Sequence, residues 1–408
     1  MSAEAPALFP PARELTPRLG DRGLFGGLAP LVYMNHAGIS PPSILVKKAI
    51  QTQLTDYMKR GAGAYPSWAE QRARLKRALA RLIGAASSEH VALMQNTTSG
   101  VVAVAQCLDW RAGDGVVVFE GEFPSNVTPW QVVARDRDLT LHMLDARRYR
   151  THEADELSRL EATLATGGVR VVAVSAVQFQ TGYAMPLAEI GALCKRHGAY
   201  LFVDAVQACG MVPLDVVALG VDFLASGAHK WLMGVEGAGF LYASPDAVGD
   251  LVPRLAGWLS HEEAIDFLFE GEGKLRYDKP IRRGVSFLEA GNVSASAFAA
   301  LEAALAPLEE LGVAVIFEHV QKIHDAIEGR ALELGFESLR SSRAAGRSGS
   351  LCLRPPRGVD VLSVYRHVVT QGVACAVPDG VLRLSPHWPN AIDEADQVVL
   401  TLEHALSS

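Results

Sequence analysis

The sequence predicts an α/β fold, built on an open and mainly parallel sheet with helices against both faces. Two patterns between residues 90 and 243 indicate it: short runs that are almost wholly apolar, and helical stretches that alternate with them. A strand that is covered on both faces has to be apolar throughout, and alternation with helices is typical of parallel sheets. After Phe287 the pattern changes to two long helical stretches and three short strands, which predicts a smaller α+β domain.

Seven apolar runs are the predicted strands of the large sheet. They cover residues 90–94, 115–119, 139–144, 169–177, 200–204, 223–225 and 239–243. Helical stretches precede and separate them at residues 67–82, 100–108, 154–165 and 187–196. In such a sheet the ligand site lies beyond the carboxyl ends of the strands, so we expect the functional side chains there.

The rest of the chain is predicted to form a small domain and an N-terminal arm. Helices are expected at 295–311, 314–334 and 392–405, and strands at 351–354, 373–376 and 381–384. We place the domain boundary near 285–295, which assigns 30–288 to the large domain and 289–408 to the small one. Residues 1–29 are rich in Pro, Arg and Gly and have little periodicity, so they predict an extended or short-helical arm that packs with the small domain.

Composition and charge narrow the classes of function. The chain has 408 residues, of which 49% are hydrophobic and 20% charged, as in a globular protein that buries a large core. Its net charge of −7 argues against general nucleic-acid binding, because a phosphate backbone attracts basic surfaces. No apolar run approaches the roughly 20 residues that span a bilayer, and the N-terminus lacks a signal-peptide pattern. Five sparse cysteines without metal-ligand spacing predict reduced thiols, a cytoplasmic protein and no metal site.

Three kinds of polar group are predicted to meet at one rim of the sheet. Asp204 ends one predicted strand, and Lys230 follows the next. Thr97 and Thr98 follow another strand and open a helix, whose free N–H groups and hydroxyls suit an anion such as phosphate. An amine, a carboxylate and a phosphate cradle at one rim fit pyridoxal phosphate.

Pyridoxal phosphate makes use of each of these groups. A lysine amine can form a Schiff base with its aldehyde, and a carboxylate beside the pyridine nitrogen keeps that nitrogen protonated, so that the ring acts as an electron sink. Each residue also has an ordinary interpretation: Lys230 as a surface side chain, Asp204 as a turn or helix cap, and Thr97 as part of a helix N-cap cluster. The conjunction of all three in this order favours the cofactor site.

Two segments carry a resemblance to a known family. They read V-D-A-V-Q-A-C-G at residues 203–210 and S-G-A-H-K-W-L at residues 226–232. From about Tyr33 to the C-terminus the sequence resembles the class V aminotransferases, pyridoxal-phosphate enzymes of fold type I that include cysteine desulfurases, kynureninases and isopenicillin N epimerase-like proteins. The resemblance implies the fold type I architecture, with a large cofactor-binding domain and a small C-terminal domain.

The resemblance also implies a role for each matching residue. Lys230 resembles the Schiff-base lysine that shuttles the proton, and Asp204 the partner of the pyridinium nitrogen. Gln207 matches the donor to the cofactor's phenolic oxygen, and His229 a residue close to the phosphate. The expected catalytic set is Lys230, Asp204 and His229, and the expected phosphate contacts are Thr97, Thr98, Ser226 and His229.

Four more residues match positions around the cofactor and the substrate. Phe123 matches a ring that lies on the cofactor face, with a core position as its alternative. Trp258 and Asn292 match residues that reach the phosphate in the partner subunit, which implies a homodimer with shared active sites. Their alternatives are a core or interface position for Trp258 and a helix cap for Asn292. Arg383 matches the arginine that binds the substrate carboxylate, which a planar guanidinium does through two parallel hydrogen bonds.

Some positions depart from the pattern of the relatives. Gly227 stands where relatives often have Ser three residues before the lysine, with Ser226 one step earlier. Desulfurases carry His at the Phe123 position and Asn at the Phe179 position. Cys375 resembles their sulfur-accepting cysteine, yet the stretch after it is too short for a mobile loop and predicts a hairpin, so we interpret it as a buried structural thiol. The phenylalanines at positions 123 and 179 favour kynureninase-like relatives.

We therefore predict a cytoplasmic, dimeric pyridoxal-phosphate enzyme that acts on an amino acid through Lys230 and cleaves a C–S or C–C bond. Transamination and amino-acid epimerisation are alternatives within the family, and a non-catalytic binding protein on the same fold is an alternative of another class. A dinucleotide-binding module is disfavoured, because the glycine-rich stretch at 234–239 comes late and precedes a strand. Besides the amino acid, the expected partner is a second copy of the chain, with no nucleic acid and no membrane.

Overall fold

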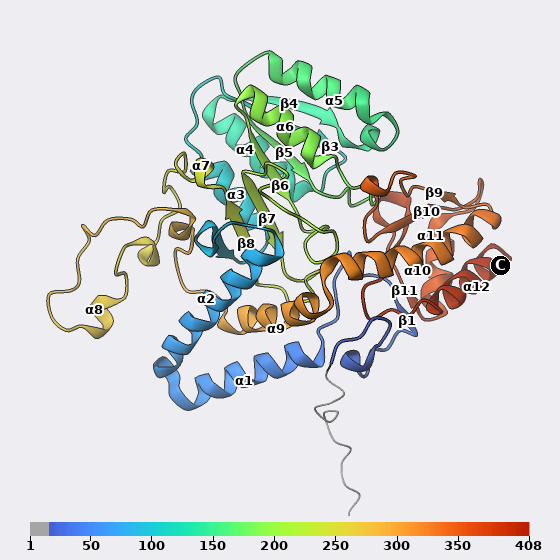
Figure 1. Cartoon of the computed structure of the whole chain (residues 1–408), viewed down its shortest axis with the longest axis horizontal. Coiled ribbons are helices and arrows are strands. Elements are labelled where there is room, and N and C mark those ends of the chain that lie inside the picture. The colour runs from blue at the N-terminus through green and yellow to red at the C-terminus, as the bar shows by residue number, and fades with distance from the viewer. Residues whose placement is uncertain (1–15, 408) are drawn as a thin grey trace, which may run out of the picture.

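The computed structural model describes residues 16–407, and in that range the central sheet has seven strands (Figure 1). The strands lie in the order β2-β8-β7-β6-β5-β3-β4. β8 runs antiparallel to β2 and β7, and the other neighbours pair in parallel. This arrangement confirms the predicted mainly parallel sheet. The bounds are β2 Val91–Met94, β3 Gly115–Glu120, β4 Thr140–Asp145, β5 Val169–Ser175, β6 Tyr200–Asp204, β7 Phe223–Gly227 and β8 Gly239–Ala243.

Helices cover both faces of this sheet, because successive side chains of a strand point to opposite faces and both sets are apolar. On one face Phe202 belongs to a core cluster that includes residues of α3 and α4. On the other face Val203 belongs to a cluster that includes residues of α2, α5 and α6. The bounds are α2 Tyr65–Leu82, α3 Thr97–Cys107, α4 Thr128–Arg137, α5 Tyr149–Ala165 and α6 Leu187–His197.

The C-terminal part of the chain builds a second, smaller sheet. Its three strands lie in the order β12-β10-β9 and are antiparallel, and β10 and β12 share a core cluster with three helices. β11 (Val373–Ala374) pairs in parallel with β1 (Val32–Tyr33), so an N-terminal strand joins this part of the molecule. The other bounds are α9 Ala295–Leu311, α10 Val313–Glu333, β9 Glu337–Ser338, β10 Leu351–Arg354, α11 Val361–Thr370, β12 Leu382–Leu384 and α12 Glu394–Ser407.

The N-terminal segment from residue 16 onward also contacts the C-terminal part. The Gly20 N–H donates to Trp388 O at 2.8 Å, and the rings of Phe25 and Trp388 lie 5.5 Å apart. The Arg22 guanidinium lies 3.5 Å from the Glu394 carboxylate. Together with the pairing of β1 and β11, these contacts tie both ends of the chain into one body.

The predicted domain division stays a prediction. Residues 1–15 of the expected arm lie outside the described residues. α9 begins at the predicted boundary, but Phe298 and Leu301 of this helix are buried in the core cluster of the large sheet. α9 also packs against α1 (Ile44–Arg60) through Ala300.

One segment projects from the body of the molecule, at the left of Figure 1. It follows the short helix α7 (Pro245–Val248) and contains α8 (Asp266–Phe269). Several large apolar side chains are exposed on it: Phe267, Leu268, Phe269, Leu275 and Tyr277. Among residues 16–407, no helix has the length and apolar character needed to cross a membrane.

Candidate active site

Asp204 and Lys230 meet at one rim of the central sheet. Asp204 is the last residue of β6 and is in register with Ala225 of the parallel neighbour β7. β7 ends at Gly227, and the following turn brings Lys230 within range of the Asp204 charge. Burial lowers the pKa of the Lys230 amine to about 8, although Asp204 acts in the opposite direction. An amine that titrates this close to neutral pH is available as a nucleophile.

The Asp204 carboxyl is buried with only one oxygen satisfied. The residue is 2% exposed, and Oδ1 accepts a hydrogen bond from the Val206 N–H at 3.0 Å. Oδ2 is also buried and has no hydrogen-bond partner among residues 16–407. Burial raises the pKa of this carboxyl to about 6, and Lys230 partly offsets the rise. Since an unsatisfied buried oxygen is costly, Oδ2 is a natural acceptor for an N–H of a ligand.

The N-terminus of α3 faces the end of β7. Asn96 caps this helix through its side chain, so Thr97 and Thr98 form its first turn. The Thr97 hydroxyl is buried and has no partner in the described part of the chain, whereas Thr98 is exposed. A Cβ on Gly227 would lie 3.3 Å from both Thr97 Oγ1 and His229 Nδ1, so the glycine leaves space between these side chains. Free helix N–H groups, a hydroxyl and an imidazole around such a space suit a phosphate.

Ser226 does not lie with Thr97 and His229, contrary to the predicted phosphate contact. It is fully buried in β7, and its hydroxyl lies against the Cys209 thiol. Cys209 and Leu224 belong to the core cluster on the face of the sheet opposite α3. Ser226 therefore points away from the Thr97 side of the strand, because side chains alternate along it.

Gln207 holds two segments together beside Asp204. Its Nε2 donates to Ala37 O at 3.0 Å, and its Oε1 accepts from Trp231 Nε1 at 2.9 Å. One N–H of the amide is left over after these two bonds. The residue is 6% exposed, so this arrangement fixes the amide at the edge of the site.

Phe123 lies over Lys230 rather than in the core. The residue is 48% exposed, and its ring centroid lies 5.6 Å from Lys230 Nζ. The ring also contacts Phe179 edge to face, with centroids 5.5 Å apart. The alternative interpretation of Phe123 as a core residue is therefore wrong.

Arg383 is a buried cation without a carboxylate partner in residues 16–407. It is 5% exposed, and its Nη1 donates to Phe179 O at 2.9 Å. Its Nε is buried and has no partner in the same range. Burial lowers the pKa of this guanidinium, and its charge in turn lowers the pKa of Lys230. A buried guanidinium of this kind is suited to bind a substrate carboxylate.

Trp258 and Asn292 lie together but not at the Lys230 rim. Both line a cavity of about 530 Å³ against α1 and α2, with Tyr57 and Phe269 among its other walls. Trp258 is 43% exposed, and Asn292 is exposed just before α9. Within one chain, these two residues therefore remain outside the Lys230 cluster.

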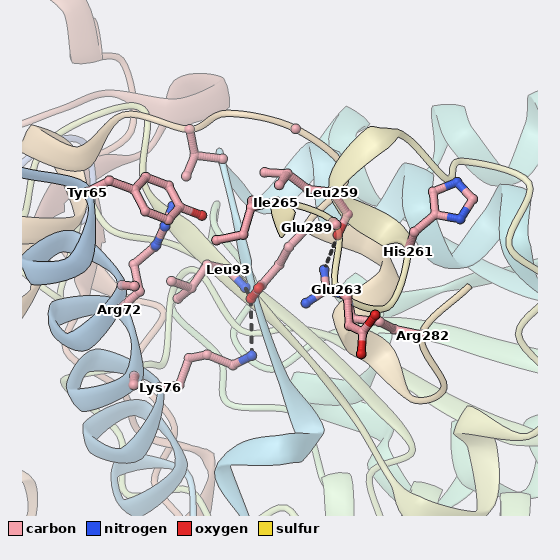
Figure 2. Close-up of a pocket in the computed structure, with 15 residues that line it drawn as sticks. Tyr65, Arg72, Lys76, Leu93, Leu259, His261, Glu263, Ile265, Arg282 and Glu289 are labelled. Atoms are coloured by element: carbon pink, nitrogen blue, oxygen red, sulfur yellow. Dashed lines mark hydrogen bonds and ion pairs between the residues drawn. The ribbon is translucent and has the colours of Figure 1, made fainter. Parts of the chain in front are cut away.

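Figure 2 shows another cavity, of about 340 Å³, between α2 and the chain around residues 259–293. Charged groups that line this cavity are paired with other groups of the protein. Lys76 Nζ lies 3.2 Å from Glu289 Oε1, and Arg282 Nη2 donates to Leu259 O at 2.6 Å. This cavity is lined by neither Lys230 nor Asp204 and forms no part of the site described above.

Glu122 is a buried carboxyl of the site that the sequence reasoning does not single out. Its Oε1 accepts from the Ser175 N–H at 2.8 Å and from Gln178 Nε2 at 3.3 Å. Ser175 is in register with Asp204 on the neighbouring strand. Burial raises the pKa of the Glu122 carboxyl to about 7, and the Asp204 charge adds to the rise. Its position just beyond β3, at the same rim as Asp204, is the signal that could have identified it.

These groups fit pyridoxal phosphate. The Asp204 oxygen that lacks a donor suits the protonated ring nitrogen, and the Thr97 hydroxyl that lacks a partner suits a phosphate oxygen. Lys230 supplies the amine, with the Phe123 ring 5.6 Å away. The donor set thus agrees with the chemistry of the cofactor.

Comparisons with known proteins agree with this site. The model of the aminotransferase class-V family matches residues 32–386. The uncharacterized aminotransferase YcbU of Bacillus subtilis is 29% identical over 354 residues, which are 86% of this chain and 87% of that protein. A probable cysteine desulfurase of Methanothermobacter thermautotrophicus is 27% identical over 394 residues, which are 91% of this chain and 94% of its own length.

A solved structure shares the fold. It is the complex of the cystine C-S lyase C-DES with its reaction product cysteine persulfide, with a TM-score of 0.81 and 22% identity. The match covers 91% of this chain and 97% of that one. Because the family model spans most of the sequence, the chain belongs to the aminotransferase class-V family and is an enzyme that uses pyridoxal phosphate.

Proposed function

We propose that Lys230 binds pyridoxal phosphate covalently as a Schiff base and that the enzyme cleaves a C–S or C–C bond of an amino acid. The observation that carries the proposal is the Lys230 amine, with a pKa of about 8, beside a buried Asp204 oxygen that lacks a donor. When bound, the cofactor supplies an electron sink for charge that develops at the substrate carbon. The side chains of this protein supply the binding, the orientation and the proton transfer.

Each side chain has a proposed task that follows from its surroundings. Asp204 holds the proton on the ring nitrogen, because its Oδ2 is a buried acceptor. Thr97, Thr98 and His229 bind the phosphate at the start of α3. Phe123 covers the ring face and keeps water from it, in line with its place over Lys230.

Arg383 and Lys230 act on the substrate. Arg383 binds the carboxylate, since it is buried and has no acidic partner in the described residues. Lys230 is then free to move a proton at the substrate carbon, because an amine with a pKa of about 8 exchanges its proton near neutral pH.

Bond cleavage is favoured over transamination by the sequence around the site and by the relatives. Phe123 and Phe179 form an aromatic wall next to Arg383. Probable desulfurases are among the relatives, and a cystine C-S lyase shares the fold. Amino-group transfer and epimerisation are the alternatives, and the relative named as an aminotransferase supports the first of these. Membership of an enzyme family leaves no support for a non-catalytic scaffold.

The test has two stages. The purified protein is expected to show the visible absorbance of a lysine-bound cofactor, and Lys230→Ala is expected to lose it. The protein is then incubated with cysteine, cystine and amino acids that have a γ-carbonyl, and the leaving fragment is measured. Transfer of the amino group to keto acids, without any released fragment, would contradict the cleavage proposal and favour the aminotransferase.

We also propose that the enzyme is a homodimer in which Trp258 and Asn292 serve the partner's site. Both residues are matched to cofactor contacts by the family resemblance, yet they line a cavity apart from Lys230. Exposed apolar side chains surround them. A second copy would cover this surface and give both residues a site to contact.

A further inference from the structure

The backbone of the Lys230 turn is held by hydrogen bonds from distant parts of the chain. Three successive carbonyls accept them. Ser40 N donates to His229 O at 2.8 Å, and Ser40 Oγ donates to Lys230 O at 2.7 Å. His387 Nε2 donates to Trp231 O at 2.9 Å. The carbonyl groups on either side of the lysine are therefore fixed from outside the turn.

The two donors come from opposite ends of the sequence. Ser40 follows β1 in the N-terminal segment, and His387 follows β12 in the C-terminal part. Ser40 is 4% exposed and His387 is fully buried, so water does not compete for these bonds. Both ends of the chain thus build the support beneath Lys230.

The hydrogen bonds also fix the tautomers of the histidines involved. His387 Nδ1 accepts from the Trp388 N–H at 2.7 Å, so its proton is on Nε2, which donates to Trp231 O. The single hydroxyl proton of Ser40 is used on Lys230 O, so His36 Nδ1, at 2.7 Å, must donate to Ser40 Oγ. The His387 imidazole is neutral because its Nδ1 accepts, and burial lowers the pKa of both His36 and His387, which favours the neutral form of each.

Other contacts also hold this turn. The Ala228 N–H donates to Ala238 O at 2.9 Å, and Trp231 and Leu232 are fully buried. The Met233 N–H also donates to Lys230 O at 2.9 Å, and Met233 has a positive φ of 57°. The Gly234 N–H donates to Ala228 O at 2.9 Å. These contacts anchor the turn before and after Lys230, and the hydrogen bonds from Ser40 and His387 orient the carbonyl groups of His229, Lys230 and Trp231 within it.

We propose that Ser40, supported by His36, and His387 are positioning residues that fix the backbone of Lys230 so that its amine reaches the cofactor. The proposal rests on the proposed role of Lys230 as the residue that binds the cofactor. It makes the N-terminal segment and the C-terminal part contributors to that step through the backbone of the turn, without a contact of Ser40 or His387 with the cofactor itself.

The experiment separates cofactor binding from covalent attachment. Cofactor-free protein is mixed with pyridoxal phosphate, total bound cofactor is measured by phosphate content, and attachment to Lys230 is measured by borohydride reduction and peptide mass spectrometry. Ser40→Ala and His387→Leu are expected to bind the cofactor but to attach it about tenfold more slowly, because loss of one hydrogen bond displaces the amine from its reactive position. His387→Gln, whose amide can donate in place of Nε2, is expected to restore the rate.

Two control variants match the substitutions. Ser43→Ala removes a buried hydroxyl from the same segment, where it caps α1 by accepting from the Val46 N–H at 3.3 Å. His324→Leu removes a fully buried imidazole of α10, a helix that contains no residue of the Lys230 turn. Both are expected to change the melting temperature but not the attachment rate.

The outcomes distinguish this proposal from the function on which it rests. If Ser40→Ala and His387→Leu attach the cofactor at the wild-type rate, the positioning role is overturned, whatever their melting temperature. If His387→Leu does not fold, His387→Gln decides: a folded variant with a slow rate also overturns the role of the donated hydrogen bond. If wild-type protein binds pyridoxal phosphate without any link to Lys230, the proposed function fails instead.

Discussion

At the scale of single residues, burial in the site disfavours the charged forms of Asp204 and Lys230. Burial raises the pKa of Asp204 to about 6 and lowers that of Lys230 to about 8, so both groups are displaced toward their neutral forms. In the proposed function, pyridoxal phosphate would offer Asp204 a protonated nitrogen and would take up the Lys230 amine in a covalent bond. The burial of these two groups is therefore expected to lower the free energy of unfolding of the cofactor-free protein, and cofactor binding should raise it again.

Asp204→Asn is expected to stabilise the cofactor-free protein at neutral pH. The folded pKa of Asp204, about 6, is above its ordinary value of 3.8. A raised folded pKa gives stability that is complete below about pH 4 and is lost as the pH rises through about 6. The variant carries no charge at residue 204. Above about pH 6 its free energy of unfolding should therefore be higher than that of the wild type by up to about 3 kcal/mol. Urea denaturation across this range measures the difference.

The same substitution should act in the opposite direction once the cofactor is present. The variant has no carboxylate for the ring nitrogen and should release pyridoxal phosphate faster on dialysis. An equal gain in stability at about pH 4 would show that the effect does not come from the Asp204 charge, since the wild-type carboxyl is neutral there.

The cysteines are expected to take no part in the reaction. All five lie in the described part of the chain and are buried. Cys375 is 4% exposed, and burial raises the pKa of its thiol to about 12. The backbone beside it is held by the bridge between Ala376 and Arg383, so the thiol cannot swing toward a substrate. If a C–S bond is cleaved, the sulfur should leave on a small molecule.

Mass spectrometry after treatment with iodoacetamide tests this expectation. The native protein should remain unlabelled, and the unfolded protein should be labelled at its five cysteines. Cys375→Ala should keep its activity within about twofold, since only a buried thiol is lost. A persulfide on Cys375 after turnover would contradict this account.

Residue placement from the sequence succeeded where the strand ends were right. Asp204 ends β6, as the apolar run predicts. Lys230 follows the neighbouring strand β7 and lies near Asp204 at the same rim of the sheet. Ser226 differs from its prediction, because it does not lie with the expected phosphate contacts. The predicted strand ends at residue 225, but β7 continues to Gly227, so alternation turns the Ser226 side chain to the Cys209 face. Glu122 is missed because its neighbour Ser175, which gives it a role, comes from a distant part of the sequence.

At the scale of elements, the contact between α3 and β7 positions the residues of the proposed phosphate site. Gly100 of α3 lies directly against Ala225 of β7, since a Cβ on this glycine would be 2.7 Å from the Ala225 Cβ. The close approach brings the start of α3 beside the end of β7. Thr97 and Gly227 owe their proximity to this contact.

Gly100→Ala is expected to push α3 away from β7. Overpacking at such a contact costs about 1–3 kcal/mol, which exceeds the gain of about 1 kcal/mol from the helix propensity of alanine. The variant should therefore unfold more easily and bind pyridoxal phosphate more weakly. Denaturant unfolding and a cofactor titration measure the two effects.

Gly329→Ala is the matched control. Gly329 lies on the exposed side of α10, and an added Cβ would meet no atom within 4 Å. Because only the higher helix propensity of alanine applies at this position, the free energy of unfolding of the control should rise by about 0.5–1 kcal/mol. Its affinity for the cofactor should not change. If Gly100→Ala behaves like this control, the close contact does not limit the approach of α3.

The elements predicted most closely are those with a continuous or periodic buried pattern. β6, β8, β10 and α9 match their predicted bounds, because each carries a continuous or periodic buried pattern. α1 escapes prediction since only Val46 of the helix is buried. α11 is rich in β-branched residues, which favour strands, and forms a helix because Val364 and Val368, one turn apart, are buried together.

At the scale of the whole molecule, one group of exposed apolar side chains lies around a single cavity. Leu54 and Tyr57 of α1 face Trp258, Leu268 and Phe269 across it. Monomeric proteins rarely expose a contiguous apolar surface of this kind, so a second copy is the proposed cover. The sequence could suggest the dimer only through its resemblance to the family, because periodicity within one chain carries no signal for a partner.

The shared site predicts that two damaged variants repair each other. Lys230→Ala removes the amine from one chain, and Asn292→Asp places a negative charge where the partner's phosphate is expected. If Asn292 acts in its own chain, a mixture of the two has no intact site. If it acts across the dimer, each mixed dimer has one intact site, made of Lys230 from the second variant and Asn292 from the first.

Random exchange of subunits makes half of the dimers mixed, so about a quarter of all sites should be intact. Co-expression of the two variants, followed by measurement of visible absorbance and activity, should recover that fraction, whereas each variant alone stays near zero in activity. Phe269→Glu in both chains is the control. A buried charge in the apolar contact should leave monomers in light scattering and abolish the recovery. Recovery by monomers, or none in dimers that form normally, would contradict the assignment of Asn292 to the partner's site.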